Sequence, residues 1–206
     1  MTITYAITVC NEFVEIQRLI AFLLKNKRIQ DNIVVLYDEA NGDHEIENFL
    51  RSHSVNGEFA WHKAKFEGHF ADWKNKLSPL CTGDYIFQID ADELPNEYIC
   101  RLLPQILESN QVDVIRVPRI NTVTGMNQDH MQQWGWAVNE HGWINFPDYQ
   151  WRIYRNADHI RWQNKVHEVL TGYETISHLP TEVEFCLTHE KTIDRQIKQN
   201  SYYANL

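Results

Sequence analysis

Three carboxylates fall within four consecutive positions, at Asp90, Asp92 and Glu93, directly after the apolar stretch "YIFQI" (85–89). Carboxylates that crowd together repel one another, and burying even one is costly without a partner of opposite charge. A hard divalent cation such as Mg²⁺ or Mn²⁺ commonly binds one or two carboxylates together with phosphate oxygens of a substrate. Such an ion neutralises charge that develops on a leaving diphosphate. The D-x-D pattern therefore predicts a metal site that serves phosphate chemistry.

The D-x-D pattern is also compatible with two simpler arrangements and with one different class of enzyme. The carboxylates could form a solvated turn, or they could cap a helix that begins near Pro95. Phosphatases with an aspartyl nucleophile also place D-x-D after an apolar strand. Their motif usually continues into Gly or Thr, whereas Glu93-Leu94-Pro95 follows here, so this similarity is weak.

The elements around the motif alternate between strand and helix. Strands are predicted at 3–9, 32–38, 57–63 and 84–90, and helices after Asn11, at 43–53, within 69–82 and at 95–110. Asn11 is predicted to cap the first helix. This alternation predicts a mostly parallel sheet with helices on both faces, whose ligands bind at the carboxyl ends of the strands. Three of these ends are polar, at 10–12, 38–39 and 90–92, and we expect them to share one crevice.

The second half of the chain has a different character. Strands are predicted at 112–123, 150–156, 165–172 and 182–190 without helices between them, and a helix is predicted from 193 onward. An aromatic and polar stretch that includes Trp134 and Trp136 lies between the first two of these strands. We expect this half to extend the sheet and to provide the place where a second substrate binds.

The composition restricts the class of partner. The chain has 206 residues and a net charge of −9, which argues against nucleic acid or an anionic membrane as the main partner, because both require clustered Lys and Arg. The four cysteines match no zinc or disulfide framework, so we expect reduced, mostly buried thiols and a cytoplasmic location. The first residues do not resemble a signal peptide, and the longest apolar run, "LIAFLL" (19–24), is too short to span a membrane. Peripheral membrane contact stays compatible with these features.

Seven segments together resemble glycosyltransferase family 2, in the order in which that family has them. They are "ITVCNE" (7–12), "YDEANGD" (37–43), "FADWKNKL" (70–77), "GDYIFQIDADE" (83–93), "WRIYRN" (151–156), "KVHEVLTG" (165–172) and "LTHEKT" (187–192). The resemblance is greatest to the branch that adds single sugars to surface glycans. It implies the GT-A fold, an α/β fold with a Rossmann-like, mostly parallel sheet. It also implies one domain over 1–206, with a nucleotide-sugar half at 1–110 and an acceptor half at 111–206.

The resemblance also implies which residues bind the donor, a nucleotide-diphosphate sugar, with a UDP-sugar favoured. The residues that it places at the base, the ribose or the sugar are Val9, Asn11, Glu12, Asp38, Asn75, Asp90 and Ala91. One of Arg152 and Arg155 could contact the diphosphate, because a guanidinium group suits pairs of oxygens. Their spacing of three places them on opposite faces of a strand.

The metal ion, Mn²⁺ or Mg²⁺, would be bound by Asp92 with help from Asp90. The family often adds a histidine from late in the chain, for which His189 is the first candidate and His167 the second. Transfer with inversion needs a general base for the acceptor hydroxyl, and Glu168 is the first candidate, with Asp148 in reserve. The Glu-Asp pair that often supplies this base is not evident in the sequence.

On this basis we expect an inverting, metal-dependent transferase that moves one sugar to a glycan, a glycolipid or another hydroxyl acceptor. Trp134 or Trp136 would line the acceptor site. The Gln-x-x-Arg-Trp pattern of processive synthases is missing, since "MQQWGW" (131–136) lacks the Arg. Two alternatives remain, a catalytically inactive relative that binds a nucleotide sugar or glycan, and a nucleotidyltransferase. The absence of a Gly-rich, Lys-bearing phosphate loop speaks against the second.

Overall fold

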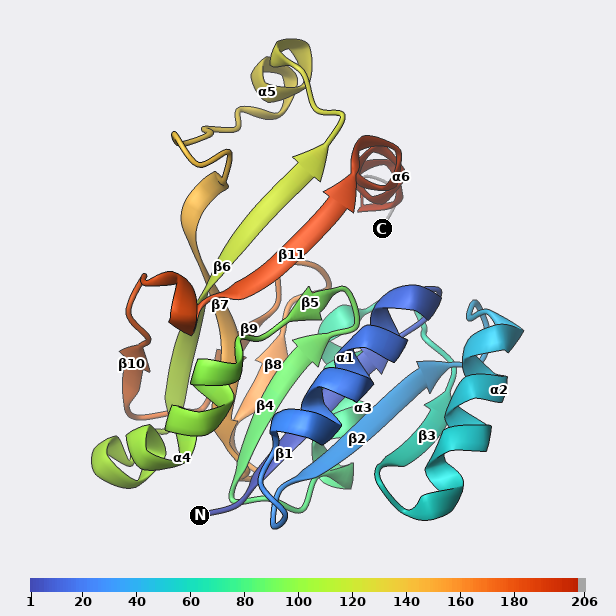
Figure 1. Ribbon diagram of the computed structural model, residues 1–206, viewed down its shortest axis with the longest axis vertical. Helices are drawn as coiled ribbons and strands as arrows, with labels where there is room; N and C mark the ends of the chain where they lie inside the picture. The colour runs from blue at the N-terminus through green and yellow to red at the C-terminus, as the bar shows by residue number, and fades with distance from the viewer. Residues whose placement is uncertain (204–206) are drawn as a thin grey trace.

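One twisted sheet organises the chain. The computed structural model describes residues 1–203, and Figure 1 shows the sheet with helices on both of its faces. The strands are β1 (Ile3–Val9), β2 (Asn32–Asp38), β3 (Ala60–Ala64), β4 (Tyr85–Asp90), β5 (Glu93–Leu94), β6 (Val114–Thr124), β7 (Ile144–Arg155), β10 (Ile176–His178) and β11 (Leu187–Thr192). Their order is β3-β2-β1-β4-β7-β6-β11-β5, with β10 paired to β6. A separate hairpin joins β8 (Arg161–Gln163) to β9 (Val169–Thr171).

The four strands from β3 to β4 are parallel and form the first half of the sheet. Strands β1, β2 and β4 are almost continuously apolar, because parallel strands covered on both faces are shielded from water on each side. Two hydrophobic clusters form the core. In β1, Tyr5, Ile7 and Val9 belong to one of these clusters, and Ala6 belongs to the second. The alternation of side chains along a strand thus supplies two cores from one element.

Helices α1 (Phe13–Asn26), α2 (His44–His53) and α4 (Glu97–Asn110) cover one face, and α3 (Phe70–Leu77) covers the other face together with the β8–β9 hairpin. Ile16, Leu19, Ile20 and Leu23 form the buried stripe of α1, as their spacing predicts. The short 3₁₀ helices are η1 (Ser54–Asn56), η2 (Ser78–Leu80) and η3 (Val183–Phe185). Among residues 1–203, no helix is both long and apolar enough to cross a membrane.

The second half of the chain continues the same sheet. β7 lies antiparallel to both β4 and β6, whereas β11 is parallel to β6. Between β6 and β7 the chain leaves the sheet as residues 125–143, which we call the arm; it carries α5 (Gln128–Trp134) and projects beyond the end of β6 (Figure 1). The last helix, α6 (Ile193–Tyr203), begins directly after β11, beside the base of the arm.

The predicted α/β fold with a mostly parallel sheet is confirmed. Three local predictions are wrong. The predicted strand at 182–190 begins with η3, and β11 starts only at Leu187. Asn11 does not cap α1; the N-cap is Glu12, whose carboxylate instead accepts hydrogen bonds from the backbone N–H groups of Cys10 and Asn11. The stretch between the strands of the second half contains α5, a helix not predicted from the sequence, which Asn127 and His130 begin with a reciprocal capping box. All four cysteines are free thiols, and all but Cys10 are buried.

Candidate functional site

The carboxyl ends of β1, β2 and β4 lie side by side, as the polar strand ends predicted. The Ala91 backbone N–H donates to the carbonyl of Thr8 at 3.2 Å, and the Cys10 Sγ lies 3.8 Å from Asp38 Oδ2. Thr8 Oγ1 also donates to Asp90 Oδ1 at 3.3 Å. Ligands of open α/β sheets bind at this edge. The three polar strand ends therefore form one candidate site.

The acidic turn after β4 is held by cations of the protein itself. Arg152, on β7, donates to Asp90 Oδ2 at 2.7 Å and to the two carboxylate oxygens of Glu93 at 2.6 and 2.9 Å. Arg119, on β6, donates to Glu93 Oε1 at 2.8 Å. Glu93 is only 1% exposed and Arg152 only 3%. The turn is therefore neither solvated nor the cap of α4, whose N-cap is Asn96.

Electrostatics at this cluster favour charged carboxylates. Burial by itself would raise the pKa of Asp90, but the positive charges of Arg152 and Lys74 outweigh it and hold that pKa well below its ordinary value. The Nζ of Lys74, on α3, lies 3.7 Å from Asp90 Oδ1. Asp90 therefore stays ionised with two protein cations beside it. Asp90 thereby links β4 with β7 and α3.

Asp92 lies beside His189, the predicted late histidine. Its Oδ2 is 3.2 Å from His189 Nε2, 3.7 Å from Lys191 Nζ and 4.0 Å from a terminal nitrogen of Arg195. Burial would raise the pKa of Asp92, but the hydrogen bond from His189 and these positive charges lower it well below its ordinary value. The structure thus brings together an ionised carboxylate, an imidazole and two further cations.

A chain of hydrogen bonds orients His189. Asn121 donates through Nδ2 to Asp148 Oδ2 at 2.8 Å, so its Oδ1 is left to accept from His189 Nδ1 at 2.8 Å. With Nδ1 donating to Asn121, the ring presents Nε2 toward Asp92 Oδ2, and a proton on Nε2 makes the hydrogen bond between them. This is the arrangement in which a histidine binds a metal while its other nitrogen is held by a second group.

Asp92 and His189 therefore fit a divalent metal ion as a pair of ligands. Residues 1–203 contain no group of three or more His, Cys, Asp or Glu side chains arranged to hold a metal, so the remaining positions would fall to water and to substrate phosphates. A metal ion at Nε2 would take the place of a proton there. Lys191 and Arg195 lie on the same side and suit the negative charge of a diphosphate.

Glu168, the predicted general base, is also near the cluster. Its Oε1 lies 3.3 Å from Lys74 Nζ, the cation that also faces Asp90. Asp148, the reserve candidate, accepts hydrogen bonds from Arg119, Asn121 and Gln150. Burial opposes ionisation, but these donors keep the pKa of Asp148 below its ordinary value. A carboxylate with all these donors is a weak base, so the geometry favours Glu168.

Other predicted donor residues lie at this edge but are occupied by the protein. Asp38 accepts from the backbone N–H groups of Ala40 and Phe66 and from the side chain of Asn41, so it orders the loop after β2. Val9 and Ala91 are buried, and Asn11 is exposed beside Glu12. Glu12 pairs with Arg195 at 3.3 Å; burial raises its pKa above the ordinary value, against the hydrogen bond from the Cys10 backbone.

Several predicted residues are not brought to the cluster. Arg155 lies opposite Tyr85 in the ladder, at the other end of β4 and about 16 Å from Asp90 along the strand, and it pairs with Asp113. The amide of Asn75 is engaged in two hydrogen bonds with the backbone of Trp162. His167 is exposed and near the ring of Tyr203. It has no contact with Asp92 among those found in residues 1–203.

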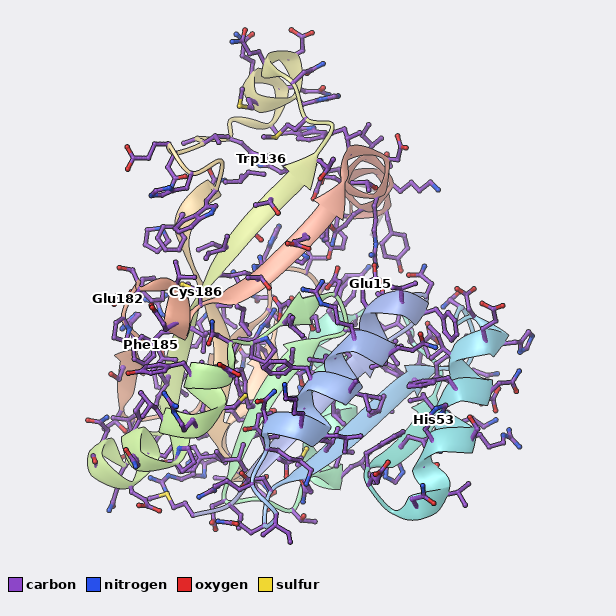
Figure 2. All side chains as sticks on the ribbon, viewed as in Figure 1. Glu15, His53, Trp136, Glu182, Phe185 and Cys186 are labelled. Atoms are coloured by element: carbon purple, nitrogen blue, oxygen red, sulfur yellow. The ribbon has the colours of Figure 1, made fainter. Side chains whose placement is uncertain are left out.

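Trp134 is the last residue of α5 on the arm. Trp136 follows it on the arm, near the end of β6 (Figure 2). Their ring centroids are 4.7 Å apart. Four cations that the structure places around the carboxylates were not predicted from the sequence: Lys74, Arg119, Lys191 and Arg195. Lys74 and Lys191 lie in segments that carry the family resemblance, which is the only sequence signal for them. Arg119 and Arg195 lie outside those segments.

Comparison of the structure with solved structures identifies the fold. S. aureus TarS 1–349 superposes with a TM-score of 0.62 at 14% sequence identity, over 92% of this chain and 60% of that one. The fold is a GT-A-like glycosyltransferase fold. TarS 1–349 in complex with UDP-GlcNAc matches with a TM-score of 0.64 at 13% identity, over 93% and 59% of the two chains. The complex with UDP matches with the same score and identity, over 92% and 60%.

This chain therefore spans about three fifths of TarS 1–349. No family model matches the sequence, and no curated protein matches it. At 13–14% identity the likeness shows the fold alone.

Proposed function

We propose that this protein is a glycosyltransferase that moves one sugar from a nucleotide-diphosphate donor to a hydroxyl group of a glycan or glycolipid. The observation that carries the proposal is the pair Asp92 and His189, set 3.2 Å apart at the carboxyl edge of a GT-A-like sheet. Structures of TarS with the same fold hold UDP-GlcNAc and UDP, which favours a UDP-sugar as the donor here.

Asp92 and His189 would hold a Mn²⁺ or Mg²⁺ ion. When bound, the ion would neutralise negative charge on the departing nucleotide diphosphate. Lys191 and Arg195 would contribute positive charge from the protein at the same place. Arg152 is fully engaged with Asp90 and Glu93, so its part is to hold the acidic turn in position rather than to bind the diphosphate.

The general base in this proposal is Glu168. Its carboxylate would accept the proton of the acceptor hydroxyl while the oxygen of that hydroxyl bonds to the anomeric carbon. The bond between that carbon and the diphosphate oxygen breaks with its electron pair, so the nucleotide diphosphate departs from the opposite face and the configuration inverts. Lys74 would keep Glu168 oriented, since its Nζ lies 3.3 Å from the carboxylate and is itself fixed over the Trp162 ring.

Two other functions can be separated from this one by their products. A catalytically inactive relative would bind the nucleotide sugar without turnover. A nucleotidyltransferase would release diphosphate from a nucleoside triphosphate. Release of a free nucleoside diphosphate from a nucleotide sugar is expected only of the transferase.

Thermal unfolding with UDP, GDP, CDP or dTDP tests the donor site, each with Mn²⁺ or with a chelator. A ligand at about 100 times its dissociation constant adds about 2.7 kcal/mol to the unfolding free energy, which corresponds to a rise of roughly 5–11 °C for a domain of this size. We expect a metal-dependent rise with one nucleotide, and we expect Asp92→Asn to lose it. Asp158→Asn is the matched control, since Asp158 is exposed and, within residues 1–203, pairs only with Arg161. No rise with any nucleotide would refute the proposal.

A further inference from the structure

The arm contains a hollow that the donor site does not use. Gln128, Met131, Gln132, Gly135 and Trp136 line it, and its volume is about 380 Å³. This is within the range of ~300–1,000 Å³ that is usual for small-molecule sites. The hollow is open to solvent, so it could accept one part of a longer ligand whose remainder extends beyond it.

An aromatic wall is built into one side of the hollow. Gly135 ends α5 in the left-handed conformation, with φ of 66°, and so turns the chain directly between Trp134 and Trp136. Their ring centroids come within 4.7 Å, and the His130 ring stacks on Trp134 at 5.2 Å. Trp136 is therefore held against a second ring, and it faces the hollow as a preformed, flat apolar surface.

Uncommitted amides lie beside this aromatic wall. Gln128 and Gln132 line the hollow, and their side chains make no hydrogen bond to another described residue. Each amide offers two N–H donors and one carbonyl acceptor, which complements hydroxyl groups that both donate and accept. Asn127 and Asn139, by contrast, are used within the arm, for the cap of α5 and for the turn after Asn139.

The charge of the arm disfavours anionic ligands. Residues 125–143 contain no Lys or Arg, and they carry two carboxylates, Asp129 and Glu140. Phosphorylated or carboxylated glycans, nucleic acid and anionic membranes would all be repelled, because each requires positive charge at the contact. A flat aromatic face beside free amides, without cations, suits the C–H faces and hydroxyl edges of uncharged sugar rings.

We propose that the arm binds an uncharged oligosaccharide through Trp136, Gln128 and Gln132. The position agrees with an outer part of an acceptor site. Asn121, which is hydrogen-bonded to His189, lies near the end of β6. Thr124, the last residue of β6, lies at the base of the arm, three residues or about 10 Å further along the strand. Identification of this oligosaccharide as the acceptor rests on the proposed transferase function, whereas its binding to the arm does not.

Binding of oligosaccharides to the whole chain, without any donor, tests the inference. The probes are maltotetraose, cellotetraose, chitotetraose and mannotetraose, with tetragalacturonate as an acidic comparison and phosphatidylcholine vesicles as a membrane comparison. Isothermal titration gives the affinity for each. Trp136→Ala and Gln132→Ala are the test variants. Gln133→Ala is the matched control, because Gln133 is on the same helix and does not line the hollow.

We expect at least one neutral tetrasaccharide to bind, with affinity reduced about tenfold or more by Trp136→Ala and severalfold by Gln132→Ala. Gln133→Ala should bind as the wild type does. Binding of none of the neutral probes, equal binding by Trp136→Ala, or Trp136-dependent binding of the vesicles instead would overturn the inference. Nucleotide-dependent stabilisation, measured on the same variants, should persist, so failure of the arm and failure of the donor site give different results.

Discussion

Replacement of Arg152 by methionine should destabilise the protein severely. Arg152 is 3% exposed and is the shared partner of Asp90 and Glu93, so Arg152→Met leaves two carboxylates with much of their charge unpaired. Removing one partner of a buried ion pair costs about 3–5 kcal/mol. At roughly 2–4 °C per kcal/mol for a chain of this size, the melting temperature should fall by about 6–20 °C.

The matched control is Arg155→Met, three residues further along the same strand. Arg155 pairs with Asp113 at 3.2 Å, and its side chain is 37% exposed, so solvent screens the pair. Its loss should cost no more than ~1 kcal/mol. Circular dichroism during thermal unfolding at pH 7 measures both variants. Equal losses of stability in the two would show that the buried cluster contributes no more to the fold than an exposed ion pair does.

The deficit of Arg152→Met should also depend on pH. The pKa of Asp90 is lower in the folded protein than in the unfolded chain, where it is about 3.9, so its pairing contributes stability above that value. This contribution is lost as the pH falls toward the folded pKa. The difference between wild type and variant should therefore be largest at neutral pH and smaller at pH 3.5. A difference that grows on acidification would contradict the assignment.

Three further outcomes are expected. Cys10 should react with iodoacetamide at pH 8 about 10²-fold more slowly than a free thiol, because burial and then the charges of Glu12 and Asp38 raise its pKa to about 12. Peptide mass spectrometry gives the rate, and a rate equal to that of glutathione would be inconsistent with this environment. Gly172→Ala should lower the free energy of unfolding by at least ~2 kcal/mol, since φ is +84° and the new Cβ would overlap the carbonyl oxygen of His159. Gly57→Ala, at φ +72° in open space, should lower it by only ~1–2 kcal/mol. Thermal unfolding that ranks the two variants in reverse would reject this expectation. Glu168→Gln should reduce transfer at least about 10²-fold and leave nucleotide-dependent stabilisation unchanged; retained transfer would exclude Glu168 as the base.

The sequence was most informative about the parallel half of the sheet. Alternating apolar and polar runs located β1, β2 and β4 almost to the residue, and the polar residues after each strand pointed to one shared edge. This works because a buried parallel strand is nearly all apolar, so its first polar residues mark where the sheet ends. The pairing of Asp92 with His189 came from the family resemblance, and the two residues are 97 positions apart in the chain.

The ion pairs between these carboxylates and cations of the protein could not be found in the same way. Arg152 and Asp90 are 62 positions apart, and a local pattern carries no information on such a contact. The direction of β7 was also unknown from sequence. Because β7 runs antiparallel to β4, Arg152 lies nearer the carboxyl end of β4 and Arg155 nearer the amino end. A strand in the other direction would have exchanged their positions.

The arm has a consequence for how this fold can diversify. β6 and β7 are already paired where the arm departs, with Asn121 opposite Ile144, so the two ends of the excursion are neighbours whatever lies between them. Closing a loop of different length between fixed ends changes the free energy only slowly with the number of residues. Residues 125–143 could therefore be shortened, lengthened or replaced by the corresponding segment of another protein without moving His189 or Asp92. Recognition of one substrate can in this way evolve as an exchangeable module, while the chemistry beside it stays fixed.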